Sequence, residues 1–457
     1  MEDQDHDLGF SVPYEIAVVR PLRLTTIAER RALLETAHWN TELLPQESIY
    51  VDLCTDSGVS SLSTTQLSLQ LGADVVEPGM GLAAEGSRAY QSLARQCRDS
   101  FGFDYVVATT QGRAAERVWI KLHVKPNTFV LGNMLFPSTR THIEMGGGKV
   151  IEVIGDAAHD LKSSEPFKGN VDPGKLEVAV NEHGKENIAC IYIELSVNAC
   201  GGHPVSLENL RAVRDFASAQ RLPVFLDGCR IFENSYLIQQ RESGYKNRSV
   251  AAIARELCSL ADGMTMSALK DLLVAHGGLI LTRDGAAYQK ANMQCFLDGT
   301  QLSSDTMRMI AAALQEICAS DSHVAARAGQ INYLWGKLEG KVPVLRPAAG
   351  HAVFLDMSSF LPDFESDDHP SEALAAFLYE RSGIRVTKGP PPAPSQRSRG
   401  IDLLRLALPA RKYVQGHLDD IARAILYTHE RRSEIRRLEQ LAVPARAKYD
   451  PAYFRLR

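Results

Sequence analysis

The chain has 457 residues, 45% of them hydrophobic and 23% charged, with 50 Lys and Arg against 55 Asp and Glu. That length exceeds one ordinary hydrophobic core and predicts two domains, in a composition typical of globular proteins. A formal charge of −5 offers no electrostatic basis for binding nucleic acid or an anionic membrane, so we expect neither as a partner.

The amino-terminal sequence MEDQDHDLGF is charged and lacks periodic apolar spacing, which predicts disorder over residues 1–10. It has no basic-then-apolar signal, and no apolar run in the chain approaches the roughly 20 residues that span a bilayer. Eight cysteines are scattered singly, with no C-x-x-C pair and no nearby His pairing. We therefore expect reduced thiols, no disulfide framework, no metal site and, by default, a cytoplasmic location.

Short apolar runs alternate with amphipathic segments in the first part of the chain. We expect an edge strand over residues 14–22 and a helix over 26–38. The run IYVDL then stops at a turn rich in hydroxyl groups that contains Thr55 and Ser57. Such a turn exposes backbone N–H groups suited to binding a carboxylate or a phosphate. The alternative is that these residues form an ordinary helix N-cap.

A second turn of this kind follows the expected strand FDYVVATT, where Gln111, Gly112 and Arg113 open a helix. It places unpaired amides and a guanidinium where a phosphate could bind; a plain strand-turn-helix with a surface arginine is the alternative. Phe136 lies in the loop after the strand TFVLG. Its ring either stacks on a planar ligand or joins the core.

Strands and helices alternate from about residue 50 to 285, which predicts an α/β fold with a mostly parallel sheet and helices on both faces. One of these strands ends at Asn198, before a Gly-Gly turn. Further on, we expect a long connecting helix over 303–341, a strand that contains Arg405, and a helix over 418–439 whose charges form a solvated face.

One lysine and one aspartate stand out in this alternation. Lys270 lies in ADGMTMSALKD, before the apolar segment LLVAHGGLILT, which predicts a partly desolvated amine that can attack a carbonyl. Asp227 follows the short buried strand 224–226, at the end of the sheet where α/β proteins bind ligands. The two side chains can therefore reach opposite sides of one flat ring, such as that of pyridoxal 5'-phosphate (PLP). Taken singly, each residue also has an ordinary explanation: Asp227 as the cap of the following turn, and Lys270 as a surface charge.

Eight blocks of sequence, in the same order, resemble the β-eliminating lyase family of PLP enzymes, which includes tryptophanase and tyrosine phenol-lyase. The resemblance covers almost the whole chain. It implies PLP fold type I, the aspartate aminotransferase-like architecture, with a large PLP-binding domain at 51–310 and a smaller α+β domain made of 11–50 and 311–457. The blocks are IYVDLCTDSG, FGFDYVV with QGRAAE, GNMLFPSTR, KENIACIYIELSVNACGGHPVS, VFLDGCRIFENSY, LADGMTMSALKD, HAVFLD and LRLALPARKY.

The resemblance also implies a role for each matched residue. Lys270 would form the Schiff base with PLP and remove the α-proton of the substrate, and Asp227 would keep the pyridine nitrogen protonated. Asn198 and Arg230 would bind the phenolic oxygen of PLP, and Phe136 would stack on its ring. The phosphate would be bound by Gln111, Gly112, Arg113 and Ser267, and the substrate by Arg405 with Thr55, Ser57 and Asn198.

The chain departs from the family at several positions. The loop 72–88 contains no tyrosine, whereas the family has a proton-donating tyrosine there. Leu269, Ala275 and Pro137 replace, respectively, a lysine, an asparagine of a cation site and a threonine. Lys388 lies near the position of an arginine expected to recognise phenol. These departures imply that the cofactor half of the site is kept and that the leaving-group half is rebuilt.

The sequence thus predicts a PLP-dependent lyase that acts at Cβ of an α-amino acid, by β-elimination or β-replacement at a C–C or C–heteroatom bond, and that is not a standard tryptophanase or tyrosine phenol-lyase. The alternatives are a PLP-dependent aldolase or aminotransferase, or a non-catalytic PLP-binding homologue. By resemblance we expect a homodimer or homotetramer, because the family's cofactor site borrows residues from a neighbouring subunit.

Overall fold

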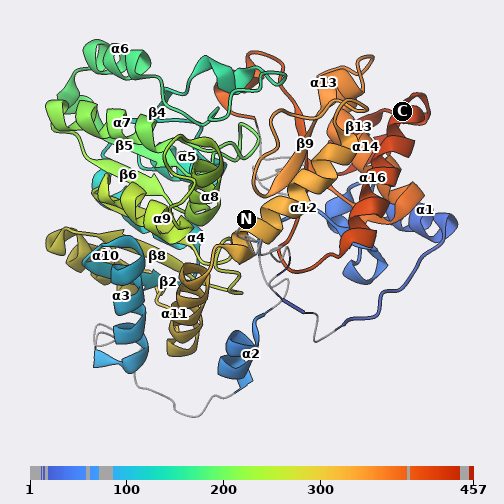
Figure 1. Cartoon of the computed structure of the whole chain (residues 1–457). Coiled ribbons are helices and arrows are strands. Elements are labelled where there is room, and N and C mark those ends of the chain that lie inside the picture. Colours follow the sequence, from blue (N-terminus) through green and yellow to red (C-terminus); the bar gives the residue numbers. More distant parts are fainter. Residues whose placement is uncertain are drawn as a thin grey trace, which may run out of the picture.

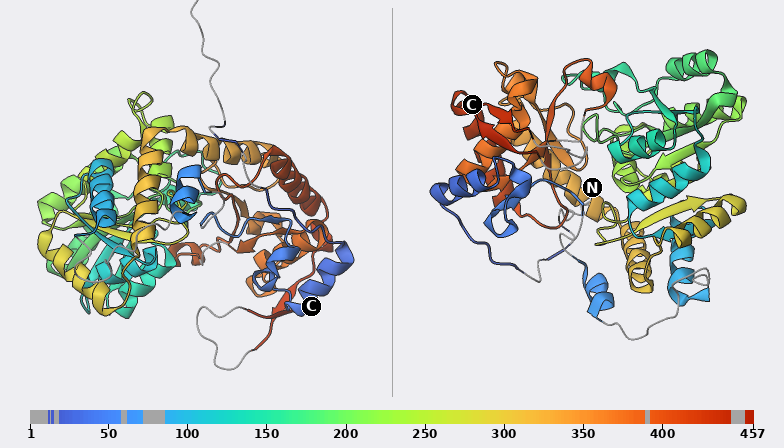
Figure 2. Two further views of the ribbon diagram at one scale, coloured as in Figure 1. Left: turned by 90° about the horizontal axis from the view of Figure 1, so that it is seen from below. Right: turned by 180° about the vertical axis from the view of Figure 1, so that it is seen from behind.

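The computed structural model describes residues 12, 14–15, 19–57, 62–71, 86–388, 392–442 and 452–457. These residues form two lobes, a larger one around a seven-stranded sheet and a smaller one built from early and late parts of the chain (Figure 1). The long helix α12 (Ser322–Leu338) extends between the lobes, and the turned views in Figure 2 show the same division. The disorder expected over residues 1–10 lies outside the described residues.

The large sheet confirms the predicted α/β fold. Its order is β2-β8-β7-β6-β5-β3-β4, with β3 to β7 parallel and β8 antiparallel to both of its neighbours. The sequence of β5, IACIYIE, is apolar on both faces because helices cover both sides of a parallel sheet. The strands are β2 (Tyr105–Thr109), β3 (Phe129–Gly132), β4 (Lys149–Glu152), β5 (Ile188–Glu194), β6 (Val224–Asp227), β7 (Gly263–Ser267) and β8 (Gly278–Thr282).

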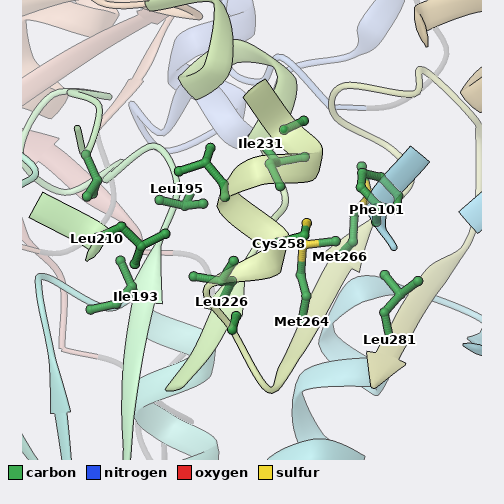
Figure 3. Close-up of a cluster of buried hydrophobic side chains, with 14 of the residues drawn as sticks. Phe101, Ile193, Leu195, Leu210, Leu226, Ile231, Cys258, Met264, Met266 and Leu281 are labelled. Atoms are coloured by element: carbon green, nitrogen blue, oxygen red, sulfur yellow. Dashed lines mark hydrogen bonds between the residues drawn. The ribbon is translucent and has the colours of Figure 1, made fainter. Parts of the chain in front are cut away.

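Side chains on the two faces of this sheet enter two separate hydrophobic clusters. On β5, Ile191 and Ile193 join one cluster while Cys190 and Tyr192 join the other, as the two-residue period of a strand requires. Figure 3 shows part of the first cluster, where Ile193, Leu226, Met264 and Leu281 from the sheet meet Leu210, Ile231 and Cys258 from helices. The helices of this lobe are α3 (Arg88–Phe101), α4 (Gly112–His123), α5 (Pro137–Met145), α6 (Pro173–His183), α7 (Leu207–Gln220), α8 (Ile231–Arg241), α9 (Val250–Ser259), α10 (Gly285–Leu297) and α11 (Ser304–Ala319), and α2 (Thr64–Leu71) packs on α11.

The smaller lobe contains three small sheets, ordered β11-β12-β9, β1-β10 and β13-β14. Its strands are β1 (Val51–Asp52), β9 (Ala352–Asp356), β10 (Ile384–Arg385), β11 (Thr387–Lys388), β12 (Leu403–Ala407), β13 (Leu438–Gln440) and β14 (Phe454–Leu456). Its helices are α1 (Ile27–Thr36), α13 (Met357–Phe360), α14 (Pro370–Ser382), α15 (Pro394–Arg397) and α16 (Gln415–Glu430), with short 3-10 turns that include Thr41–Leu43 and Gln46–Ser48. α14 packs against both α1 and α16, although α1 is far from it in sequence (Figure 1).

Three predicted elements differ from the structure. The expected helix over 303–341 is two helices, because Ser320 is extended and its hydroxyl accepts a hydrogen bond from the Ser322 N–H at 3.2 Å. The helix predicted to reach residue 439 ends at Glu430, since the following residues turn into β13 and pair with β14. Of the edge strand expected over 14–22, the described residues are irregular.

β1 packs with the smaller lobe. β1 pairs with β10, and Val51 and Leu53 pack in the core of the smaller lobe. We therefore propose that the domain border lies after residue 53 rather than before residue 51. Among the helices that the structure describes, none combines the length and the apolar character needed to cross a membrane.

Candidate active site

The acid of the predicted pair lies at the carboxyl end of a central strand. Asp227 is the last residue of β6 and pairs in register with Glu194 on β5 and Thr265 on β7. Its side chain is buried, and its Oδ1 accepts a hydrogen bond from the Cys229 N–H at 2.9 Å. Asp227 thus faces the edge of the sheet where ligands bind in α/β folds.

The lysine of the pair follows the neighbouring strand. Lys270 is half-buried shortly after the end of β7, and its Nζ lies 5.1 Å from the centroid of the Phe136 ring. Phe136 is the residue before α5. The charges of Lys270 and Asp227 both act on the buried carboxyl groups of Glu116 and Glu194. The amine therefore lies beside the aromatic ring, and amine and acid both act on the same two carboxyl groups.

The expected phosphate-binding residues meet at the start of α4. Gln111 precedes this helix, and no side chain caps it, so its first N–H groups are available to an anion. Gly112 lies directly against Ser267, since a Cβ on Gly112 would be 2.6 Å from the Ser267 Cβ. Arg113 is exposed in the first turn of the same helix.

Arg405 lies close to Asn198, with its Nη1 3.4 Å from the Asn198 Oδ1. Its Nη2 donates to the carbonyl oxygen of Cys54 at 2.8 Å. Thr55 and Ser57 follow Cys54 in a tight turn, where the Ser57 N–H donates to the Thr55 Oγ1 at 3.0 Å. Two buried donors, the Arg405 Nε and the Asn198 Nδ2, have no partner among the described residues. Unpaired buried donors are costly, so these atoms indicate an acceptor that the ligand supplies.

Arg230 is held by an aspartate that the sequence analysis did not select. Its Nε and Nη2 each donate to Asp56 at 3.0 Å, and Arg327 donates to the same carboxylate at 2.9 Å. Burial alone would raise the pKa of Asp56, but the charges of Arg230 and Arg327 hold it well below its usual range. The only signal in the sequence was the position of Asp56 inside the turn rich in hydroxyl groups.

His351 and Glu233 are further site residues that the sequence analysis missed. The His351 Nε2 lies 3.1 Å from the Asn198 Oδ1, and its Nδ1 lies 2.9 Å from the Glu233 Oε1. Burial, with the charge of Arg230, lowers the pKa of His351 to about 4. The ring is therefore neutral at physiological pH. No local pattern identifies these residues, because their partners lie far away in sequence.

Two buried carboxyl groups flank Asp227. Glu194 accepts the Asn198 N–H at its Oε1 at 2.8 Å, while its Oε2 has no partner among the described residues. Burial and the negative charge of Asp227 raise the pKa of Glu194 to about 8 and that of Glu116 to about 7. Glu194 is therefore mostly protonated at neutral pH, which limits the negative charge gathered around Asp227.

These groups together fit a phosphorylated pyridine aldehyde. The pocket offers one amine, one buried carboxylate, an aromatic face, an uncapped helix start and unpaired buried donors. The close contact between Gly112 and Ser267 brings the helix start and the end of β7 to one place. This set matches the parts that a PLP site needs.

Solved structures share this architecture at low sequence identity. A serine palmitoyltransferase from Sphingomonas wittichii matches with a TM-score of 0.64 at 14% identity, over 90% of this chain and 97% of that chain. An aminotransferase from Staphylococcus aureus matches with a TM-score of 0.60 at 14% identity, over 83% and 94%. The architecture is therefore that of PLP-dependent fold type I.

The sequence relatives narrow this class. The family profile described as β-eliminating lyase matches residues 52–424. Proteins named tyrosine phenol-lyase are 38% identical in Nostoc punctiforme, over 98% of this chain and 97% of that protein, and 37% identical in Pasteurella multocida, over 97% and 98%. This chain therefore belongs to the β-eliminating lyase family, with PLP as its cofactor.

Proposed function

We propose that this protein is a lyase that acts at Cβ of an α-amino acid and releases or exchanges the β-substituent. The observation that carries the proposal is the placement of Lys270 beside the Phe136 ring, of Asp227 at the end of β6, and of Arg405 with its unpaired Nε close to Asn198. Bound PLP would supply an electron-withdrawing ring conjugated to Cα. The residues of the chain would orient the substrate and move its protons.

We assign the following work to these residues. Lys270 binds the cofactor aldehyde and takes the proton from Cα, and Asp227 holds the proton on the ring nitrogen. Phe136 stacks on the ring. Asn198 and Arg230 donate to its phenolic oxygen; Gln111, Gly112, Arg113 and Ser267 hold the phosphate; and Arg405, with Thr55, Ser57 and Asn198, holds the α-carboxylate.

The proposal is tested by exchange of the Cα proton of L-alanine for deuterium, measured by NMR on the PLP-loaded enzyme. Alanine has no leaving group, so exchange reports proton removal alone. We expect exchange by the wild type and a loss of about 10²-fold or more in Lys270→Ala. Lys337→Ala, which changes a surface lysine paired with Asp419 at 3.1 Å, is the matched control. Equal exchange by wild type and Lys270→Ala would overturn the assignment of Lys270.

Product analysis separates this function from the other reactions of the fold. Elimination releases ammonia and a keto acid, whereas an aminotransferase needs a keto-acid acceptor and an aldolase releases glycine and an aldehyde from a β-hydroxy amino acid. A non-catalytic homologue would bind PLP without exchange at Cα. We further propose that the leaving group differs from phenol and indole, on the basis of Leu269, Ala275 and Pro137 at positions that the resemblance assigns to other residues.

We propose that the protein assembles as a homodimer or homotetramer. Val19, Leu24 and Ile27 are exposed large hydrophobic residues near the start of the chain, at 79, 75 and 47%, and the burial of exposed apolar side chains favours association. Sedimentation equilibrium of the full chain tests this, and a monomer at micromolar concentration would contradict it. A cytoplasmic location stays a prediction, supported by eight free cysteines.

A further inference from the structure

Glu194 and Asp227 end neighbouring strands on the same side of the large sheet. They are register partners on the parallel strands β5 and β6, so their Cβ atoms are about 5 Å apart. Two residues earlier on each strand, Tyr192 and Phe225 join the hydrophobic cluster that also contains the buried residues of α4. Glu194 and Asp227 therefore lie on the side of the sheet where α4 begins and where we place the phosphate of PLP.

The carboxyl group of Glu194 is removed from water and only half of it is hydrogen-bonded. The residue is 3% exposed, and its Oε1 accepts the Asn198 N–H at 2.8 Å. Its Oε2 has no hydrogen-bond partner among the described residues. A carboxylate in such a place is costly, whereas a protonated carboxyl group can act as a donor through this second oxygen.

The charges around Glu194 are of both signs. Asp227 on β6 repels its ionised form, while Arg230, before α8, and Lys270, after β7, attract it. Arg230 is already paired with Asp56 at 3.0 Å. Burial and the charge of Asp227 prevail and raise the pKa of Glu194 to about 8. Near neutral pH, Glu194 therefore keeps a proton beside the Asp227 carboxyl group, as one member of a close carboxyl pair does.

A protonated ring nitrogen would change this balance. Asp227 is the residue that we assign to the ring nitrogen of PLP, so a positive charge would come to lie beside Asp227 and offset its repulsion of Glu194. Burial of Glu194 would increase little, because the side chain is already buried. The net effect is a lower pKa of Glu194 and the loss of its proton to the solvent.

From this we infer that Glu194 is a positioning residue of the PLP site that acts through Asp227: it keeps a proton while Asp227 has no cationic partner, and releases that proton to the solvent when a protonated ring nitrogen binds Asp227. The inference rests on the proposed function, because it takes Asp227 as the partner of the ring nitrogen. Ionised Glu194 adds a second negative charge near that nitrogen and so stabilises its protonated form. Cofactor binding is thereby linked to pH.

The test counts the protons released when the PLP-free full chain binds pyridoxine 5'-phosphate. This probe has the ring nitrogen and the phosphate of PLP but an alcohol in place of the aldehyde, so it forms no bond with Lys270. Calorimetric titrations in two buffers of different ionisation enthalpy give the number of protons. At pH 7 we expect the wild type to release about 0.5 proton per chain more than Glu194→Gln, which corresponds to a relative gain in affinity of about tenfold from pH 6 to pH 8.

Glu194→Gln keeps the size of the side chain and an oxygen for the Asn198 N–H, but it cannot ionise. Protons exchanged by the probe, by Lys270 or by the buried Glu116 are common to wild type and variant, so they cancel in the difference. Glu182→Gln, at an exposed glutamate of α6, is the matched control and should release as many protons as the wild type.

Infrared spectra of the wild type alone give an independent measurement, because a protonated carboxyl group absorbs at a different frequency from a carboxylate. We expect the band of protonated carboxyl groups to weaken when the probe binds at pH 7. This measurement does not depend on the folding of any variant.

Two results would overturn the inference: a proton release by the wild type that is equal to or smaller than that of Glu194→Gln, or an unchanged band of protonated carboxyl groups. Failure of the proposed function is seen separately, as absence of Cα exchange with L-alanine in the wild type. Because the probe binds without reacting, the proton count can be measured even in that case.

Discussion

Glu194 shows how a single buried group can govern the pH response of this site. Its carboxyl lies beside Asp227 with one oxygen unpaired among the described residues, and burial with the charge of Asp227 raises its pKa to about 8. In an unfolded chain this pKa is near 4.3. Its proton is thus held more tightly in the folded state, so its contribution favours folding below about pH 4 and is lost as pH rises toward 8.

Replacing Glu194 by glutamine should therefore flatten the pH dependence of stability. An amide cannot ionise, and it keeps an oxygen to accept the Asn198 N–H. We expect the melting temperature of Glu194→Gln to exceed that of the wild type by about 2 °C or more at pH 8.5, with a smaller difference at pH 5.5. Scanning calorimetry at both pH values measures this. Glu182→Gln, at an exposed glutamate, should leave the melting temperature unchanged at both pH values. If the melting temperatures of Glu194→Gln and wild type differ by the same amount at both pH values, the assignment is contradicted.

At the scale of single residues, the sequence could predict side chains that sit at the ends of strands. Asp227 and Asn198 were selected in this way, because a short apolar run followed by a polar residue predicts a strand end. Lys270 was selected as the lysine of a turn that precedes an apolar segment. Glu194 and His351 could not be found, since each lies in an apolar run and becomes significant only through partners distant in sequence.

At the scale of elements, the join between α4 and β7 is the contact on which the proposed phosphate site depends. A Cβ on Gly112 would lie 2.6 Å from the Ser267 Cβ, which is closer than side-chain carbons approach. Gly112→Ala should therefore push the start of the helix away from Ser267. We expect PLP to bind at least about tenfold more weakly, with a loss of about 1–3 kcal/mol in the free energy of unfolding from overpacking.

Equilibrium dialysis with PLP and denaturant unfolding of the PLP-free protein measure the two effects of Gly112→Ala. Gly329→Ala in α12 is the matched control, because nothing lies within 4 Å of its added Cβ. That change should leave PLP affinity unaltered and should stabilise the helix slightly. Unchanged affinity in Gly112→Ala would show that the helix start does not hold the phosphate.

The sequence predicted element types better than element limits. Alternating apolar runs correctly predicted the parallel sheet, because both of its faces are buried and the runs are continuous. The break at Ser320 was missed because the apolar spacing continues through it, and the strand β13 was missed because its partner, β14, comes from the end of the chain. Contacts of that kind carry no signal in the local pattern.

At the scale of the molecule, Asp56 joins the two lobes. It follows β1 of the smaller lobe, while Arg230 precedes α8 in the larger lobe and Arg327 belongs to the connecting helix α12. The bonds between them, at 2.9 to 3.0 Å, are buried. Removing one partner of a buried ion pair is costly because the remaining charges lose both water and counter-ion.

Asp56→Asn should accordingly lower the free energy of unfolding by about 3–5 kcal/mol. The pKa of Asp56 is depressed, so its contribution is complete above the unfolded value near 3.9 and is lost only as pH falls through the folded value. The difference between wild type and variant should thus stay constant from pH 5 to 8, as measured by denaturant unfolding. Asp419→Asn, in an exposed pair with Lys337 at 3.1 Å, should lower the free energy of unfolding far less, because water screens that pair. If the two variants lose equal stability, Asp56 does not join the lobes.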